Sequence, residues 1–401
     1  MLIINSGMEQ EKLKVLFISS WFPNKVNPTL GNFVEKHAEA VSLYADVAVL
    51  YVCFDDLLTS KQSYVYEKHH KLDVHIVYLR KIKTNLPFIA SLVKLFWIIK
   101  AYHYGFHQIY KKEKPDIVHA NVLIPIGLIA YCLKLIYHIP YIITEHWTGY
   151  LPQDANKPTW TLFFYRYFAK NAGALTPVTL SLAKAMQDFN IIGNYKVIPN
   201  VVETNLFKKK ELTSDTIKHI IHISSLVDEQ KNISGILLAI HELAKHRDDF
   251  VLEIISDGDF QQYQAKIERL GIADKIIYHG KKNTDEVAVI LAQCDFLLLY
   301  SNYENFPCVI AEAMSCGLAV LSTDVGGIAE HINENNGILI EAHNSEMLIS
   351  ALMLMLSNCS NYNATKIRAY AENYFSYPII GKQYIEVYQT VLNKTNNQGA
   401  K

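Results

Sequence analysis

Residues 295–323 read DFLLLYSNYENFPCVIAEAMSCGLAVLST: an apolar run, a short polar loop, an apolar helical stretch and a second apolar run. The first run, DFLLLYS, predicts a buried strand that ends at Ser301. The loop 302–307 ends in Pro307, which suits a helix start, and 309–316 is predicted as that helix. The run LAVLST (318–323) predicts the next strand. A strand, a helix and a second strand in such close succession form the unit of a parallel sheet.

Two glutamates interrupt this nearly uncharged unit. Glu304 lies on the predicted loop, and Glu312 lies on the helix, slightly more than one turn in. The acid at Glu304 is explained about equally well as a complement to the helix dipole, worth ~0.3–1 kcal/mol. That explanation does not cover Glu312, whose neighbours are apolar. The helix start also directs backbone amides outward, an arrangement that attracts anions.

Short apolar runs alternate with helical stretches along the whole chain, which predicts an α/β fold. Before Asn200 the predicted strands are 15–19, 47–52, 73–79, 116–120, 141–146, 174–178 and 196–200, with a helix over 33–44. After it they are 219–225, 250–256, 275–280, 295–301, 318–323 and 337–341. The polar stretch 208–215 separates the two sets. We therefore predict two Rossmann-like, doubly wound domains, over 1–203 and 204–376, and a C-terminal helix in 377–401 that packs back on the first domain.

Length and composition agree with two soluble-type domains. The chain has 401 residues, of which 50% are hydrophobic, enough for two large cores. A net charge of -1 provides no overall field for binding nucleic acid. The six cysteines show no C-x-x-C pairing and are predicted to be reduced, as in a cytoplasmic protein. No signal peptide is visible in 1–12, and the longest nearly uncharged run, 86–99, is too short to span a bilayer.

Ligands of open α/β sheets bind beyond the carboxyl ends of the strands. Two such sheets that face each other form a cleft. The chemistry is therefore expected in the segments that directly follow strands.

The stretch ENFPCVIAEAMSCGLAVLSTDVGGIAE (304–330) resembles the signature of glycosyltransferase family 4, also called glycosyl transferases group 1. The family pattern is E-x-F-P-x4-E-A-M-x-x-G-x-P-V, followed by G-G and a glutamate. Positions in register are Glu304, Phe306, Pro307, Glu312, Ala313, Met314, Gly317, Val320, Gly326, Gly327 and Glu330. Ala319 stands where proline is usual. The resemblance runs from Lys14 to about Tyr388.

This resemblance implies a retaining glycosyltransferase of GT-B fold, with two Rossmann-like domains facing each other across a cleft. Such an enzyme moves a sugar from a nucleotide-sugar donor, here a UDP- or GDP-sugar, to a sugar or lipid-linked glycan acceptor. The setting implied is bacterial cell-surface polysaccharide or glycolipid synthesis. The donor is a co-substrate, and no cofactor is expected.

The family signature also assigns roles to residues of the donor site. The second glutamate, Glu312, would hold the ribose hydroxyls, a task suited to a carboxylate, which accepts two hydroxyl protons. The first, Glu304, would lie beside the transferred sugar. The residues that follow would meet sugar hydroxyls or the diphosphate: Asn305, Phe306, Pro307, Cys308 and Val309.

Two further segments resemble the parts of the family that bind phosphate. In ISSLVDEQKNISGILLA (223–239), Lys231 occupies the place of the family's lysine, whereas Ser225 replaces the usual arginine. The alternative for Lys231 is a solvated lysine ahead of a helix. In SSWFPNKVNPTLGNFVEKHAEAV (19–41), Gly31 precedes a helix where the backbone approaches diphosphate.

The remaining candidates follow other strands. His146, in ITEHW (143–147), falls where the family places an active-site histidine, and without that position it would be read as structural. His119 is predicted to be a wall of the cleft. The loops ISDGDF (255–260) and YHGKKN (278–283) resemble base-binding loops.

These loops contribute Asp257, Gly258 and Gly280 to the predicted donor site. Asp257 and Asp259 also spell D-x-D, a manganese motif of another glycosyltransferase fold. We predict no metal site, because the resemblance implies a fold that generally works without metal. In VIPNVVETNLF (197–207), Asn200 and Glu203 are expected to fix the linker or to touch ligand.

The predicted catalytic residues are Glu304, His146 and Lys231. The transition state resembles an oxocarbenium ion, and its departing diphosphate needs oriented amides and cations. The stretch 80–112 combines seven basic residues with Phe88, Phe96 and Trp97, and is predicted to contact an anionic membrane surface on its cytoplasmic face. The alternative for that stretch is an ordinary helix with an apolar face toward the core.

Two other functions remain open at this point. One is a nucleotide-sugar epimerase of the same fold, which needs no acceptor and would lack the signature of 304–330. The other is a non-catalytic binding protein on a decayed scaffold, an interpretation that only Ser225 supports.

Overall fold

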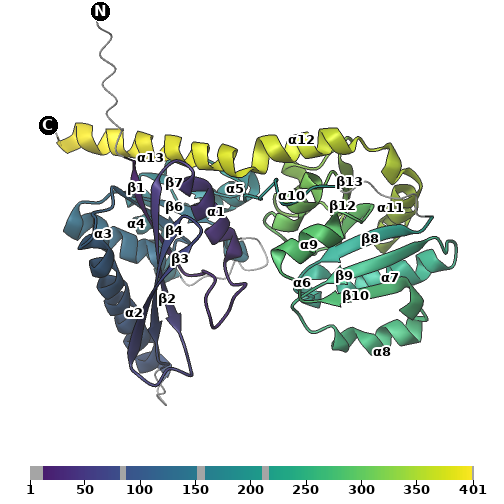
Figure 1. Cartoon of the computed structure of the whole chain (residues 1–401), viewed down its shortest axis with the longest axis horizontal. Helices are drawn as coiled ribbons and strands as arrows, with labels where there is room; N and C mark the ends of the chain where they lie inside the picture. The colour runs from purple at the N-terminus through teal and green to yellow at the C-terminus, as the bar shows by residue number, and fades with distance from the viewer. Residues whose placement is uncertain (1–11, 82–86, 151–158, 210–215, 400–401) are drawn as a thin grey trace, which may run out of the picture.

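The computed structural model describes residues 12–81, 87–150, 159–209 and 216–399. Figure 1 shows two α/β domains side by side, with the C-terminal helices running along both. This architecture confirms the predicted fold class of two Rossmann-like domains. Parts of the predicted membrane stretch (82–86) and of the linker (210–215) lie outside the described residues.

The N-terminal domain is built on one seven-stranded sheet of order β3-β4-β2-β1-β5-β6-β7. Its strands are β1 (Lys14–Ser19), β2 (Asp46–Phe54), β3 (Gln62–His69), β4 (Leu72–Leu79), β5 (Ile117–Asn121), β6 (Tyr141–Glu145) and β7 (Ala174–Pro177). Its helices are α1 (Asn32–Ser42), α2 (Pro87–Tyr110), α3 (Ile126–Tyr137), α4 (Thr159–Asn171) and α5 (Leu180–Asp188). Only β3 is antiparallel, to β4.

The two faces of this sheet bury separate apolar cores because strand side chains alternate. On β1, Leu16 and Ile18 join the core under α2, α3 and α4. Val15 and Phe17 join the core under α1 and the C-terminal helix. Every strand that is covered on both faces is therefore apolar at nearly every position, as parallel sheets require.

The C-terminal domain holds a fully parallel six-stranded sheet of order β10-β9-β8-β11-β12-β13. Its strands are β8 (Lys218–Ile223), β9 (Phe250–Ile255), β10 (Ile276–Gly280), β11 (Phe296–Leu299), β12 (Ala319–Thr323) and β13 (Gly337–Ile340). Its helices are α6 (Asp228–Lys231), α7 (Ile233–Ala244), α8 (Gln261–Leu270), α9 (Thr284–Leu291), α10 (Cys308–Ser315), α11 (Ser345–Asn358) and α12 (Ala364–Phe375). The strand order reverses between β8 and β11, which is the switch point where ligands of such sheets bind.

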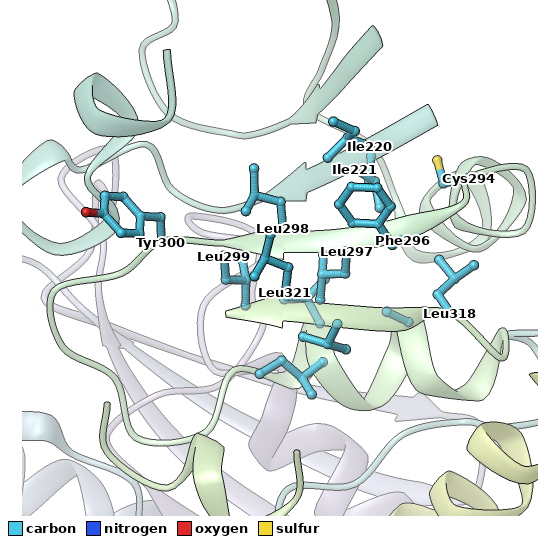
Figure 2. Close-up of a cluster of buried hydrophobic side chains, with 14 of the residues drawn as sticks. Ile220, Ile221, Cys294, Phe296, Leu297, Leu298, Leu299, Tyr300, Leu318 and Leu321 are labelled. Carbon is cyan, nitrogen blue, oxygen red and sulfur yellow. The ribbon is translucent and has the colours of Figure 1, made fainter. Parts of the chain in front are cut away.

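The core of this domain surrounds β11. Figure 2 shows Phe296 and Leu298 on this strand among Ile220, Ile221 and Leu321 of the neighbouring strands. All five side chains are fully buried. Each such side chain contributes about 1.5–3 kcal/mol relative to an exposed position. The core thus fixes the end of β11, from which the loop with Glu304 leaves.

The last helix, α13 (Tyr377–Gly399), follows α12 and lies on the N-terminal domain (Figure 1). The Tyr377 hydroxyl donates to Glu39 of α1 at 2.7 Å. The Tyr44 hydroxyl donates to the Pro378 carbonyl at 3.1 Å. Because the chain crosses between the domains both at 200–207 and at α12–α13, two connections constrain the cleft.

Three sequence-based predictions about the N-terminal domain differ from the structure. Strand β3 was not predicted, because it is an edge strand whose side chains are at most partly buried and mostly polar. No strand forms over 196–200: Lys196 and Ile198 donate to β7 carbonyls at 2.9 and 3.2 Å, and Pro199 then lacks an N–H. His119 is not a wall of the cleft.

His119 is fully buried in the middle of β5. Its Nδ1 contacts the Tyr388 hydroxyl and its Nε2 the Thr144 hydroxyl, both at 2.6 Å. Burial holds the pKa of His119 well below its usual range. The ring is therefore a structural link between the sheet and α13.

Among the described residues, no helix combines the length and the hydropathy needed to cross a bilayer.

Candidate active site

A cleft of about 560 Å³ lies between the two domains. This volume is within the usual range for small-ligand sites. One wall comes from α1 and the loop before it: Pro28, Thr29, Asn32, Glu35 and Lys36. The other comes from the linker, from the ends of β8, β9 and β10, and from the helices α9 and α10: Phe207, Ile223, Ser224, Ile255, Ser256, Asp257, Lys281, Lys282, Asn283, Thr284, Val287 and Glu312.

Glu312 faces this cleft and forms an ion pair with a lysine of the other domain. Lys36 of α1 donates to Glu312 Oε1 at 2.8 Å, and the side chains are 11% and 13% exposed. Burial favours the neutral amine, but the charge and hydrogen bond of Glu312, together with Cys308 and Glu39, outweigh it, so the pKa of Lys36 lies above its ordinary value. The two domains thus meet at the glutamate that the sequence assigned to ribose.

Glu304 and Lys231 meet at the switch point between β8 and β11. Lys231 Nζ contacts Glu304 Oε1, and Ser301 Oγ donates to the same carboxylate at 2.9 Å. Glu304 is only 6% exposed, so its charge needs this compensation. The alternative interpretation of Lys231, a solvated lysine ahead of a helix, is wrong, because its side chain is only 13% exposed and is paired with Glu304.

His146 is placed by its neighbour Glu145. The buried Glu145 carboxylate accepts from the amides of His146, Trp147 and Leu123, each at 3.0 Å. The His146 ring then packs on Phe33 of α1, with ring centres 4.5 Å apart. Burial, with His37 nearby, lowers the pKa of His146 well below its usual range, so the imidazole is neutral at physiological pH.

Several buried polar atoms around His146 lack hydrogen-bond partners within the part of the chain that the structure describes. These are both ring nitrogens of His146, Asn200 Oδ1 and Asn305 Oδ1. The three side chains lie close together: Asn305 Nδ2 donates to the His146 carbonyl at 2.5 Å, and Asn200 Nδ2 to the Phe306 carbonyl at 2.9 Å. Buried polar atoms are rarely left unsatisfied, so this group marks a place for a polar ligand or water.

The loop from Asn305 to Val309 has mixed roles. The Phe306 ring is 3% exposed and packs on Phe375, with ring centres 5.2 Å apart. Pro307 is the N-cap of α10, which begins at Cys308. Val309 is buried in the core, so the side chains at 306 and 309 hold the loop in place rather than face the cleft.

Two predicted glycines are required by close backbone approach. A Cβ on Gly258 would lie 2.0 Å from the carbonyl oxygen of Ser225, so glycine lets the loops after β8 and β9 touch. Gly31 has φ +70°, and its Cβ would lie 2.5 Å from the carbonyl carbon of Trp21. Gly280 also has positive φ, at the end of β10, but a Cβ there would meet open space.

The side chain of Ser225, the residue in the place of the family's arginine, is exposed.

The aspartates of the D-x-D sequence do not converge. Asp257 lines the cleft and accepts a long contact, 3.5 Å, from Thr29 Oγ1 of the other domain. Asp259 accepts from the Gln261 amide at 2.9 Å. Within the described residues, no group of three or more His, Cys, Asp or Glu side chains is arranged to hold a metal ion.

Sequence reasoning missed three lysines of the cleft: Lys36, Lys281 and Lys282. All three lie inside stretches that resemble the family, but nothing in the sequence shows which face of α1 Lys36 occupies.

The sequence also assigned no role to Glu330. Its two carboxylate oxygens accept from the amides of Leu180 and Ser181, both at 2.8 Å, and so join the C-terminal domain to the start of α5.

Comparison with known proteins places both halves of the chain in one family. The family model described as "Glycosyltransferase Family 4" matches residues 47–206, and that described as "Glycosyl transferases group 1" matches residues 203–373. The N-acetyl-alpha-D-glucosaminyl L-malate synthase of Bacillus anthracis is 26% identical over 305 residues, 72% of this chain and 78% of that protein. The putative teichuronic acid biosynthesis glycosyltransferase TuaC of Bacillus subtilis is 23% identical, covering 85% and 88%.

A solved structure extends the comparison to nearly the whole fold. HepE of Anabaena, in complex with UDP, superimposes with a TM-score of 0.71 at 20% identity, over 94% of this chain and 100% of that one. The protein described here is therefore a glycosyltransferase with the GT-B fold and belongs to the group 1 enzymes of family 4.

Proposed function

We propose that this glycosyltransferase moves a sugar from a nucleotide-sugar donor to a glycan or lipid-linked acceptor, with retention of anomeric configuration. The observation that carries the proposal is the cleft between the domains, where Glu312 faces the loops that end β8, β9 and β10. The bound UDP of HepE and the teichuronic acid assignment of TuaC favour a UDP-sugar and cell-surface polysaccharide synthesis.

In the proposed site, Glu312 accepts from the ribose hydroxyls, and the loops with Asp257, Gly258 and Gly280 surround the base. The sugar lies toward His146 and Glu304, where the unsatisfied atoms of Asn200 and Asn305 meet its hydroxyls. Neutral imidazole suits this place, because its nitrogens offer one donor and one acceptor to hydroxyl groups.

The proposed reaction breaks the bond from the anomeric carbon to the diphosphate oxygen. The acceptor oxygen forms the new bond on the same face, and its proton passes to the departing phosphate. Lys231 and the amides at the start of α10 stabilise the diphosphate as its charge grows. Glu304 orients the sugar, with its charge balanced by Lys231 until the donor binds.

The test begins with thermal unfolding of the purified protein in the presence of UDP, GDP, ADP and their sugars. A bound nucleotide raises the melting temperature by mass action. The donor found is then assayed with and without glycan acceptors, and the anomeric configuration of the product is read by NMR. If none of these nucleotides is bound, the proposal is wrong; if the sugar is altered while still attached to the nucleotide, the enzyme is an epimerase.

Glu312→Gln should weaken binding of the donor nucleotide by about 1–3 kcal/mol, because a charged acceptor for two hydroxyls becomes a neutral amide. Calorimetric titration with UDP and with uridine measures the loss, which should appear for both. Glu334→Gln removes an exposed carboxylate of the same domain and is the control. Unchanged affinity for uridine would remove Glu312 from the ribose role.

Activity should survive EDTA. The proposed stabilisation of the leaving group uses lysine and backbone amides, and Asp259 is engaged by the Gln261 amide. Transfer rates are compared before and after chelation and after adding manganese back. A rate abolished by EDTA and restored by manganese would return Asp257 and Asp259 to consideration as ligands.

We also propose contact with an anionic bilayer through the stretch 80–112. On α2, Phe96 is 61% exposed and Leu95 37% exposed, with Lys94 and Lys100 on the same outer stretch. Exposed aromatic and basic side chains on one helix suit the interface between lipid headgroups and water. Such contact would bring a lipid-linked acceptor to the N-terminal domain.

A further inference from the structure

The phosphate loop, by which we mean the segment 223–239, offers fewer cations than the corresponding segment of the family. Ser225 stands in the place of the usual arginine and is exposed. The remaining lysine, Lys231, is already held by Glu304. A departing diphosphate carries more than one negative charge, so a second positive group is expected near it.

Lys36 is placed to be that group. It follows Asn32 by four residues on α1, and both line the cleft together with Ser224 of the phosphate loop. Residues four apart lie on one face of a helix, and helical side chains lean toward the N-terminus. The Lys36 ammonium therefore lies on the side of the N-terminal end of α1, where Gly31 is in the left-handed conformation and where anions are favoured.

The surroundings of Lys36 hold its charge inside the cleft. Its side chain is 11% exposed, and its ammonium is 2.8 Å from Glu312 Oε1 and 5.9 Å from the centre of the Phe207 ring. A carboxylate has about four lone-pair sites, so Glu312 can accept from Lys36 and from ribose hydroxyls at once. Lys36 would then lie beside the ribose, next to which the diphosphate is attached.

We propose that Lys36 supplies the second cation for the donor diphosphate, from the opposite domain, in place of the arginine that Ser225 replaces. Glu312 holds the ammonium in the cleft and keeps it at the ribose end when the donor binds. The inference rests on the proposed function, since it assumes a nucleoside diphosphate in this cleft. Because Lys36 and Lys231 belong to different domains, both cations reach the diphosphate only when the domains are closed on each other.

The test separates phosphate recognition from nucleoside recognition. Calorimetric affinities for UDP and uridine, and for GDP and guanosine, are measured on wild type, Lys36→Met, Lys36→Arg and Lys36→Met/Ser225→Arg. We expect Lys36→Met to weaken the diphosphate at least tenfold and the nucleoside less than threefold. Lys36→Arg should keep most of the affinity, and Ser225→Arg should restore it in the methionine background. In turnover, kcat should fall with Lys36→Met and recover in the double variant.

Lys218→Met is the matched control. Lys218 forms a partly buried pair with Asp295 at 2.9 Å within the C-terminal domain, so it reports the general effect of breaking such a pair. Equal losses for UDP and uridine in Lys36→Met, or no loss for UDP, would overturn the role of Lys36 while leaving the proposed function intact. If wild type binds none of UDP, GDP and ADP, the proposed function fails and the Lys36 role fails with it.

Discussion

Lys231→Ala is expected to lower kcat by about 10²–10³-fold, with a smaller change in donor affinity. The leaving diphosphate gains charge as the glycosidic bond breaks, so a cation beside it stabilises the transition state more than the ground state. Lys231 ends α6 at the switch point between β8 and β11, where the loops of both strands meet. Steady-state kinetics with the natural donor, beside calorimetric affinity, measures the two effects separately.

The contact of Lys231 with Glu304 adds a structural consequence that must be separated from catalysis. Without Lys231, the buried Glu304 carboxylate keeps its contacts with Ser301 Oγ at 2.9 Å and Gln230 Nε2 at 3.4 Å, and neither partner is charged. Removing one member of a buried ion pair costs roughly 3–5 kcal/mol of stability. The melting temperature of the alanine variant is therefore measured beside its kinetics.

Lys231→Arg is the matched variant, because it keeps the charge and can retain the pair with Glu304. We expect its melting temperature near that of wild type and a kcat well above that of the alanine variant. A near-normal kcat in Lys231→Ala, or a defect found wholly in donor affinity, would contradict the assignment. The charge for the leaving group would then come from Lys36 and from backbone amides.

The fold was predictable because buried parallel strands are apolar on both faces. β11 and β12 show this as continuous runs, and the helix between them carries Pro307 at its start. β3 was not predicted because it is an edge strand whose side chains do not alternate between buried and exposed positions. The run 196–200 was predicted as a strand from Val197 and Ile198, but Pro199 interrupts its pairing with β7.

The sequence could predict which residues of the site follow strands, but not which side chains from other parts of the chain lie beside them. Glu304, Glu312 and Lys231 could be singled out by motif, but their charges are balanced by partners far away in sequence. Lys36 and Glu312 are 276 positions apart, and no local pattern joins them. The sequence placed both His119 and His146 near strand ends, yet His119 lies within β5 under α13. His146 directly follows β6 and lies beside the unsatisfied atoms of Asn200 and Asn305.

Acid should destabilise this protein at a pH well above that at which protonation of its carboxylates alone would do so. Burial lowers the pKa of His37 and of His222 to about 4, and it also holds those of His119 and His146 well below the usual value. The unfolded chain binds these protons near pH 6.5, whereas the native chain does not. Stability is therefore complete above pH 6.5 and is lost as the pH falls from there toward 4.

The size of this effect follows from the width of the window. A shift from 6.5 to about 4 corresponds to about 3 kcal/mol for each of His37 and His222. Domains of this kind have a total stability of roughly 5–15 kcal/mol. Glu39 and Glu145, whose pKa is raised by burial, and His69, whose pKa is raised in spite of burial by Glu35 and Glu67, work in the opposite direction, because the native state takes up their protons more readily as the pH falls. The histidines with a lowered pKa outnumber them: His37, His75, His119, His146, His222 and His331.

His222→Gln tests this account at one position, directly beneath the phosphate loop. His222 Nδ1 donates to the Leu298 carbonyl at 2.9 Å and its Nε2 lies 2.8 Å from Ser224 Oγ, and a glutamine amide can offer similar groups without titrating. Urea unfolding at pH 7.5, 6 and 5 should show a smaller loss in this variant, by about 1 kcal/mol per pH unit below 6.5. His246→Gln, at an exposed position, should leave the wild-type slope unchanged. A wild-type stability that stays constant from pH 7.5 to 5 would refute the argument.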